Sequence, residues 1–249
     1  MEVVHFRYLL LKMRKKNRAF TTAHPTVSLP PPFYIYETYG LDYHNYYYGG
    51  QKTAEWIATK IREFSTTTTP KILDWGCGSG RVLRHLPTAY PSGNVFGADY
   101  NANYVAWCQQ HLTNCEVVKN DLVPPIRFED SFFDAVYSIS IFTHLSETNH
   151  EGWMGELSRL TKSSGVVIIS THGKSFLSKL STEEQQRYLN GQLVVHSYKV
   201  EGNRLYAAYQ PPKYFQKLAV KHHFQVLEHL ENPSIKGRPQ QDIWILRKI

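Results

Sequence analysis

The segment Lys71-Ile-Leu-Asp-Trp-Gly-Cys-Gly-Ser-Gly-Arg81 sets the architecture of this 249-residue chain. An apolar run ends in Asp74, glycines alternate at positions 76, 78 and 80, and a helical pattern follows. Glycine lets the backbone turn sharply and lets a ligand lie against the main chain without meeting a Cβ. In open parallel sheets, ligands bind beyond the carboxyl end of such a strand. The segment therefore predicts a ligand-binding turn between a strand and a helix.

From Lys71 onward, apolar runs of strand length alternate with stretches of helical periodicity. The expected strands are 72–75, 95–99, 116–119, 135–139 and 166–171. The expected helices between them are 81–86, 103–112 and 151–160. Alternation at this spacing specifies an α/β fold, with a parallel sheet covered by helices on both faces. After the fifth strand we expect a helix at 182–189, a hairpin around 201–203, another helix opened by Pro211-Pro212, and a strand pair at 224–230 and 242–246.

The first 69 residues have a different character. Helical spacing of apolar residues predicts one helix within 1–20 and another over 51–64. Between them, prolines predict a non-helical linker over 21–33, followed by a tyrosine-rich stretch. We expect residues 1–69 to form a basic tail and an aromatic, helical cap. The main domain would then span 70–249, with an inserted lid at about 175–210.

The net charge of +7 is concentrated at the N-terminus. Residues 1–20 hold six basic residues against one acid, so the remaining chain is close to neutral. Such a segment is most often a solvated helix, but it can also touch a membrane surface, RNA or an acidic partner. Because the body is nearly neutral, nucleic acid is disfavoured as the main partner. The oligomeric state is left open by the sequence.

Composition places the chain among soluble globular proteins. It is 42% hydrophobic and 20% charged, and its apolar runs are too short to cross a bilayer. Its three cysteines form no even framework and no paired metal motif, so reduced thiols and no metal site are expected. No signal peptide is evident, and a cytoplasmic location is the expectation.

Two further acidic positions accompany the glycine turn. Asp99 ends the second expected strand, where a carboxylate can accept hydrogen bonds from ribose hydroxyls. Asp121 follows the third strand in Asn120-Asp-Leu122, where it can accept from an adenine amino group. The glycine spacing is G-x-G-x-G, which departs from both the dinucleotide fingerprint and the nucleoside-triphosphate loop.

These three segments, in order, resemble the class I S-adenosylmethionine-dependent methyltransferases. The resemblance continues through Phe133-Asp134 to Leu145 and through Glu156 to Gly165, covering about residues 70–173. It implies a Rossmann-like fold, with a mostly parallel seven-stranded sheet, an antiparallel C-terminal strand and helices on both faces. Segments 35–43 and 241–247 look like a bacterial subgroup whose substrates are mostly unassigned.

The resemblance also implies S-adenosylmethionine as cofactor and assigns residues to it. Asp74 and the backbone of 76–78 would hold the methionine end, Asp99 the ribose and Asp121 the adenine, and Ser138 would offer a backbone carbonyl to the ammonium group. Trp75 departs from the family, which more often has a smaller residue there, so the pocket is expected to be narrower. The expected cofactor-binding residues are Asp74, Gly76, Cys77, Gly78, Gly80, Asp99, Tyr100, Asn120, Asp121, Leu122 and Ser138.

Methyl transfer asks the protein to align the reactants, exclude water and, for a hydroxyl acceptor, remove a proton. His144, after the fourth strand, is the first candidate base, and His172, after the fifth, is the second. Both can equally be packing residues. Glu37, His44 and the neighbouring tyrosines could reach over the cofactor from the cap.

The favoured acceptor is a small molecule, such as a sugar, a glycan intermediate or a specialised metabolite, with O-methylation as one option. An RNA or protein methyltransferase using the basic tail is the alternative, as is a non-catalytic cofactor-binding protein. The chain lacks the Asn-Pro-Pro-aromatic motif of amino-methylating nucleic-acid enzymes after its fourth strand. The pair His222-His223 has no third ligand at usable spacing, so a metal is not expected.

Overall fold

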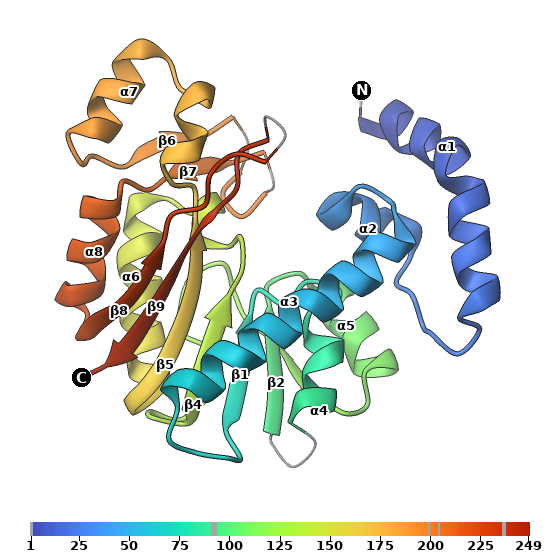
Figure 1. Ribbon diagram of the computed structural model, residues 1–249, viewed down its shortest axis with the longest axis horizontal. Helices are drawn as coiled ribbons and strands as arrows, with labels where there is room; N and C mark the ends of the chain where they lie inside the picture. The colour runs from blue at the N-terminus through green and yellow to red at the C-terminus, as the bar shows by residue number, and fades with distance from the viewer. Residues whose placement is uncertain (1, 91–93, 199, 204, 236–237) are drawn as a thin grey trace.

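Seven strands form the main sheet at the centre of the computed structural model (Figure 1). The structure describes residues 2–90, 94–198, 200–203, 205–235 and 238–249. The strands are β1 (Lys71–Trp75), β2 (Asn94–Asp99), β3 (Glu116–Lys119), β4 (Phe133–Ser138), β5 (Thr161–Thr171), β8 (Phe224–Leu230) and β9 (Asp242–Lys248). Their order is β3-β2-β1-β4-β5-β9-β8. Because the order reverses between β1 and β4, the loops after these two strands open onto one crevice.

The direction of the strands confirms the expected sheet. β1 to β5 are parallel, while β9 is antiparallel to both of its neighbours, β5 and β8. Parallel strands are covered on both faces and therefore carry continuous apolar runs. Ile72 and Leu73, adjacent in β1, are both fully buried but belong to different apolar clusters, one on each face of the sheet. The sheet is mostly parallel, with an antiparallel C-terminal strand.

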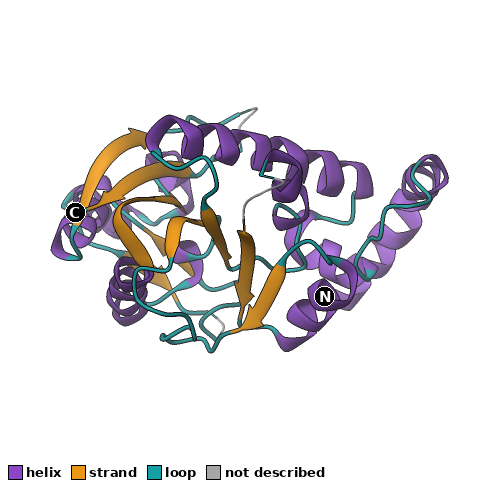
Figure 2. Cartoon of the chain, turned by 90° about the horizontal axis from the view of Figure 1, so that it is seen from below, coloured by secondary structure: helices purple, strands orange, loops and turns teal. Residues whose placement is uncertain are grey.

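Helices lie on both sides of the sheet (Figure 2). On one face, Ile57 of α3 packs in the cluster of Ile72, and on the other, Trp153 of α6 packs in the cluster of Leu73. The helices that contribute to these clusters are α3 (Tyr43–Phe64), α4 (Leu86–Ala89) and α5 (Ala102–His111) on the first face, and α6 (Glu147–Leu160) and α8 (Pro212–Lys221) on the second. The expected α/β fold, with helices on both faces of the sheet, is confirmed.

Two helices differ from the sequence-based expectation because of proline and capping. The helix expected at 81–86 is a 3-10 turn, η1 (Leu83–His85), followed by the short α4. Pro87 in the first turn of α4 has no N–H to continue a helix from upstream. α6 begins at Glu147, earlier than expected, because the Ser146 side chain accepts from the Asn149 N–H and caps it.

The linker expected over 21–33 is shorter than predicted. α1 (Glu2–Ala23) continues past residue 20, and α2 (Pro32–Tyr39) begins within the proline run. Proline is tolerated in the first helical turn, where its missing N–H has no intrahelical partner to lose. The inner face of α1 packs on α2 and the start of α3, with Phe6 and Leu9 against Ile35 and Tyr36. Within the described residues, no helix combines the length and apolar character needed to cross a bilayer.

Residues 174–209 form a separate layer above the sheet, at the top of Figure 1. The layer contains η3 (Lys174–Lys179), α7 (Thr182–Leu189), β6 (Val194–His196) and β7 (Ala207–Tyr209). β6 and β7 pair antiparallel, which confirms the expected hairpin, and α7 has the predicted bounds. Positions 199 and 204 of this segment lie outside the described residues.

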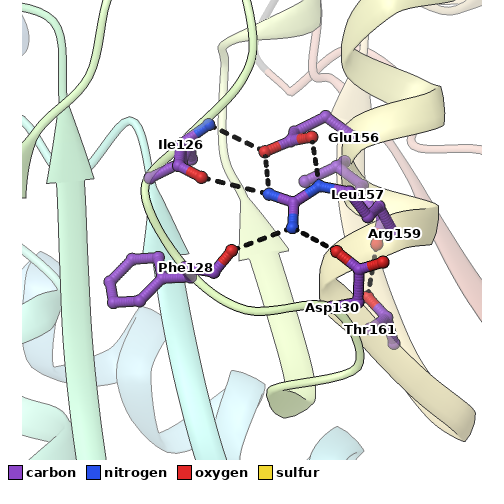
Figure 3. A network of polar contacts seen from close by, with 7 residues as sticks. All are labelled: Ile126, Phe128, Asp130, Glu156, Leu157, Arg159 and Thr161. Atoms are coloured by element: carbon purple, nitrogen blue, oxygen red, sulfur yellow. Dashed lines mark hydrogen bonds and ion pairs between the residues drawn. The ribbon is translucent and has the colours of Figure 1, made fainter.

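A polar network around Arg159 fixes the loop that leads into β4 (Figure 3). The guanidinium donates to both carboxylate oxygens of Glu156, at 2.9 and 2.7 Å. It also donates to the carbonyl oxygens of Ile126 (3.0 Å) and Phe128 (2.8 Å) and to Asp130 (2.6 Å). Glu156 is only 6% exposed and accepts from the Ile126 N–H as well. The network therefore holds a nearly buried carboxylate beside its counter-ion.

Replacing Arg159 with methionine is expected to lower the free energy of unfolding by about 3 kcal/mol, because Glu156 would be left buried without its cation. Urea denaturation measures this loss. Lys162→Met is the matched control: Lys162 pairs with Asp134 but is 41% exposed. That variant should lose less than about 1 kcal/mol. Equal losses in the two variants would contradict a structural role for the network.

Candidate functional site

The glycine turn after β1 has the backbone geometry that the sequence predicted. Gly76 and Gly78 adopt positive φ angles of 81° and 55°, a region that favours glycine. The N–H groups of Gly76 and Cys77 both donate to the carbonyl oxygen of Ala98 in β2, at 2.8 and 3.1 Å. A Cβ built on Gly76 would lie 2.2 Å from Ile141, whereas one on Gly78 would meet nothing within 4 Å. The backbone of Gly78 therefore borders open space.

That space is a cavity of about 830 Å³ at the carboxyl ends of the strands. Its lining brings together six of the residues predicted for cofactor binding and one of the two predicted bases: Asp74, Gly76, Cys77, Gly78, Asp99, Tyr100 and His144. A second, smaller cavity of about 60 Å³ adjoins it and shares Gly76, Asp99, Tyr100 and His144. The two cavities together can hold an elongated ligand along the tips of β1, β2 and β3.

Asp99, at the end of β2, both shapes the glycine turn and faces the cavities. One carboxylate oxygen accepts from the Gly78 N–H and the other from the Asn101 N–H, each at 2.8 Å. The residue is 6% exposed, and burial raises the pKa of its carboxyl above the ordinary value. Each carboxylate oxygen has a second acceptor position, so Asp99 can still receive hydrogen bonds from a ligand hydroxyl.

Asp74 is a buried carboxyl near the end of β1, and Arg81 lines the same cavity. Asp74 is 4% exposed, and burial raises its pKa to about 7, with the nearby Asp99 carboxylate contributing in the same direction. A cationic group of a ligand placed beside Asp74 would favour the ionised form and lower this pKa. The chemistry of the site therefore suits an ammonium group at the end of β1.

The smaller cavity has mostly apolar walls. Trp75 lies on its lining and packs against Trp153, with ring centroids 4.4 Å apart; Leu122 and Leu145 are further wall residues. Trp75 is therefore part of the wall of this space; that it narrows the pocket stays a prediction. The aromatic and apolar walls suit the flat ring of a base.

The polar groups at the end of β3 are arranged differently from what the sequence alone suggested. The side chain of Asp121 is 81% exposed and accepts from Lys119 Nζ at 3.0 Å, although the residue borders the smaller cavity. Asn120 is 7% exposed, and its Oδ1 atom is buried with no hydrogen-bond partner among the described residues. Asn120 therefore carries an acceptor that a ligand N–H could satisfy, while the Asp121 carboxylate lies at the surface.

His144 lies at the junction of the two cavities, in the 3-10 turn η2 (Phe142–His144). Its Nδ1 atom is 2.7 Å from the carbonyl oxygen of Tyr206. A carbonyl only accepts, so Nδ1 carries the proton and Nε2 keeps its lone pair in the neutral ring. Burial lowers the pKa of His144 below its ordinary value. The ring is therefore neutral near pH 7 and available as a base.

The segment between β6 and β7 contacts this histidine directly. The N–H of Gly202 donates to the His144 carbonyl at 3.0 Å, and the Tyr100 hydroxyl donates to the Gly202 carbonyl at 3.1 Å. Glu201 accepts from the Asn149 side-chain amide at 2.8 Å. The segment around Gly202 therefore covers the junction of the cavities.

Three predicted residues, His172, Gly80 and Ser138, line neither cavity. The His172 ring packs on Phe176, with centroids 4.1 Å apart, and burial lowers its pKa to about 3. A Cβ on Gly80 would lie 2.4 Å from Leu112, so this glycine permits close packing on α5. Ser138 is fully buried inside the sheet. The structure thus places these three behind the cavity wall.

A second set of residues lining the larger cavity belongs to no recognisable sequence motif. Ser170 accepts from the Ser140 N–H and donates to the Gln241 side chain, both at 2.7 Å. The Gln241 amide donates to the Ser140 hydroxyl at 2.8 Å. Ser140 also has a positive φ of 64°, a strained conformation for a residue with a side chain. Because β4, β5 and β9 meet only in the folded sheet, the network is invisible in linear sequence.

From the cap, Glu37 and Thr38 line the larger cavity, and Glu37 accepts from the Tyr104 hydroxyl at 2.6 Å. His44, Tyr43 and tyrosines 46–48 are not part of either lining, which agrees with the simpler interpretation of these aromatic residues as a packed cap. Tyr46 is buried and donates to the Ser79 carbonyl at 3.0 Å, so it supports the glycine turn from behind. Among the described residues there is no cluster of three or more metal ligands.

Comparison with known proteins finds a family that matches the middle of the chain. Residues 72–165 match the family described as a methyltransferase domain. The chain is 32% identical over 74 residues to a malonyl-acyl-carrier-protein O-methyltransferase of Magnetococcus marinus, covering 30% of this chain and 27% of that protein. It is 25% identical over 139 residues to the protein of the same name from Bacillus cereus, covering 55% of this chain and 50% of that protein. The matches thus span half or less of these relatives.

Solved structures share the fold over most of the chain. A protein from Pyrococcus horikoshii superposes with a TM-score of 0.62 at 19% identity, covering 86% of this chain and 98% of that one. The magnesium protoporphyrin IX methyltransferase of Synechocystis with bound SAH gives a TM-score of 0.60 at 14% identity, covering 86% and 97%. At these identities the likeness concerns the fold.

Proposed function

Because residues 72–165 match a methyltransferase-domain family, we propose that the protein is a class I S-adenosylmethionine-dependent methyltransferase that transfers the methyl group of this cofactor to a small molecule. The carrying observation is that β1, β2 and β3 each end in a buried or cavity-lining acceptor, namely Asp74, Asp99 and Asn120. A single ligand with an ammonium group, a ribose and a base requires acceptors of these kinds in this order.

The residues present fit the cofactor from end to end. Asp74 would hold the ammonium group of the methionine part, with the open backbone of Gly78 beside it. Asp99 would receive the ribose hydroxyls through its remaining acceptor positions. The smaller cavity would take the adenine, with Asn120 Oδ1 as the acceptor for a ring N–H. Asp121, the adenine partner expected from the sequence, could assist from the surface.

When bound, the cofactor supplies an electrophilic methyl group on a sulfonium that is already a good leaving group. The chain must therefore place the acceptor in line, keep water out and remove one proton. We assign the proton to His144: Nε2 takes it from the acceptor hydroxyl as the new oxygen–carbon bond forms, and the neutral ring becomes an imidazolium. The carbonyl of Tyr206 holds the ring through Nδ1 in both protonation states.

The acceptor side of the cavity supports a hydroxylated small molecule. Ser140 and Gln241 present a hydroxyl and an amide to the space, and Phe176 and Ile243 add apolar wall. The relatives of Magnetococcus and Bacillus are named as O-methyltransferases, which favours oxygen as the acceptor atom. Residues 175–210 would act as the lid, because Gly202 covers the junction where His144 lies.

Two measurements test this proposal. Calorimetric titration with S-adenosylhomocysteine should show one site per chain. Incubation with S-adenosylmethionine carrying a labelled methyl group should transfer label to hydroxylated small molecules, screened as sugars and aromatic alcohols, but not to RNA or protein. Absence of cofactor binding would overturn the proposal as a whole. Binding without any transfer would favour the non-catalytic alternative.

Cofactor affinity should depend on pH through Asp74. With a pKa of about 7, the carboxyl is about nine-tenths protonated at pH 6, and it must ionise to pair with the ammonium group. S-adenosylhomocysteine binding should therefore release a proton below pH 7. Affinity should rise up to about tenfold per pH unit until it levels off above pH 7. Calorimetric titration at pH 6 in buffers of different ionisation enthalpy measures the number of protons released on binding. An affinity that does not change from pH 5.5 to pH 7.5 would contradict the pairing of Asp74 with the ammonium group.

A further inference from the structure

The outward side of α1 is an unusual surface, which we call the outer ridge. It combines four exposed cations with four exposed apolar or aromatic side chains. Val3, Val4, Tyr8 and Leu11 are 62%, 71%, 54% and 74% exposed. The ridge consists of Val3, Val4, Arg7, Tyr8, Leu11, Arg14, Lys15 and Arg18.

The charge of the ridge is not neutralised within the protein. Lys16 pairs with Asp42, and Lys12 lies 5.5 Å from the centre of the Tyr8 ring. In the part of the chain that the structure describes, the four cations of the ridge have no carboxylate partner. The sequence also has no acidic residue from position 3 to position 36. The ridge is therefore a continuous source of positive potential.

The ridge has a fixed orientation, because the opposite side of α1 is anchored. Asn17 is 8% exposed; its side-chain amide donates to the Leu41 carbonyl at 3.0 Å and its oxygen accepts from the Tyr43 N–H at 3.1 Å. Phe20 is 5% exposed and packs near the ring of Tyr47, 5.8 Å away. In Figure 1, α1 stands at the edge of the molecule, apart from the sheet. A flat partner could approach it without meeting the rest of the protein.

We propose that the outer ridge docks the protein on an anionic lipid surface. Lys and Arg attract anionic headgroups, and interleaved aliphatic side chains gain free energy by entering the acyl boundary. Exposed Val4 and Leu11 fit this partner better than they fit a polynucleotide, whose phosphates reward cations alone. The proposal goes beyond the methyl-transfer function and does not depend on it.

Helix α2 connects the outer ridge to the larger cavity. This helix packs Ile35 and Tyr36 in the cluster with the inner side of α1, while its next two residues, Glu37 and Thr38, line the larger cavity. The ridge and the rim of the cavity are thus joined through a single short helix. Docking would set the cavity at a defined position relative to the bilayer, where an amphipathic acceptor could be taken up.

Co-flotation of the full chain with vesicles tests the proposal. Vesicles of phosphatidylglycerol and phosphatidylcholine should carry the protein, and pure phosphatidylcholine vesicles should not. Each cation near the surface changes the partition coefficient about fivefold. The triple variant Arg14→Gln, Lys15→Gln, Arg18→Gln should therefore bind about 100-fold more weakly. The double variant Val4→Ser, Leu11→Ser should also lose vesicle binding.

The matched control removes the same charge elsewhere: Lys52→Gln, Lys213→Gln, Lys217→Gln, all exposed positions outside α1. It should bind vesicles like the parent protein. Equal loss in both triple variants would overturn the proposal in favour of a net-charge effect. Binding to poly(U) RNA with no vesicle binding would overturn it in favour of a nucleic-acid partner. Circular dichroism and S-adenosylhomocysteine titration show that each variant is folded, and they report the proposed function separately.

Discussion

Replacing Asp99 with alanine should weaken S-adenosylhomocysteine binding by about 100-fold or more. The substitution removes the acceptors for two ribose hydroxyls, and hydrogen bonds to a charged group are each worth about 1.5–3 kcal/mol. It also leaves the N–H groups of Gly78 and Asn101 without the carboxylate that now accepts from them at 2.8 Å. The substitution would therefore remove hydrogen bonds that hold the glycine turn as well as the proposed contact with the ribose. Calorimetric titration measures the change.

Asp121→Ala is the matched control for this experiment. Both positions are aspartates at a strand end, but the Asp121 side chain is 81% exposed and engaged by Lys119. Its removal should change affinity by less than about threefold, the range of a surface ion pair. Asn120→Ala should have the larger effect at this strand, because its buried Oδ1 awaits a partner. A large loss for Asp121→Ala and none for Asn120→Ala would restore the sequence-based assignment of adenine to Asp121.

Removing the imidazole of His144 should lower kcat for methyl transfer by about 1,000-fold, within the range that general bases contribute. Cofactor affinity should stay within about threefold, because the assigned cofactor ligands are untouched. The pH profile gives a second readout. Since burial lowers the pKa of His144, kcat should rise with pH through a value below the ordinary 6.5 and then level off. In His144→Ala this limb should disappear.

Two companion variants separate chemistry from structure. His144→Asn can still donate to the Tyr206 carbonyl but offers no base, so it should lose as much activity as alanine. His172→Asn should keep kcat within about threefold, because His172 is packed on Phe176 behind the cavity wall. Loss of activity in His172→Asn with a normal melting temperature would move the base to the second histidine.

The sequence predicted the parallel sheet and the turn after β1 because their signals are local. The alternation of apolar runs with helical periodicity indicates the sheet, and the glycine turn that follows β1 indicates the crevice. Asp74 and Asp99 could be named as lining candidates because each lies at the end of its strand, and both line the larger cavity. The domain boundary at 69/70 stays a prediction; α3, before that boundary, buries Ile57 in the same cluster as Ile72 of β1.

The side of the cavity proposed to hold the methyl acceptor could not be predicted, because it depends on contacts between residues that are far apart in the sequence. Ser140, Ser170 and Gln241 are separated by 30 and 71 positions and meet only because β5 pairs with β4 on one side and with β9 on the other. Which of two adjacent residues is buried was equally hidden: Asn120 lies inward while Asp121 lies outward. Sequence identifies the end of a strand, but the packing of neighbouring elements decides which side chain points in.

The His144 ring links the proposed proton transfer to the segment that precedes β7. The Nδ1 proton of His144 is held by the carbonyl of Tyr206, the residue before β7. Once Nε2 has taken a proton, the ring is cationic, and hydrogen bonds from a charged donor are roughly twice as strong. The hydrogen bond from His144 to Tyr206 would therefore be strongest immediately after methyl transfer and would weaken when the ring loses that proton to solvent. Product release would then follow deprotonation of the ring, after methyl transfer rather than together with it.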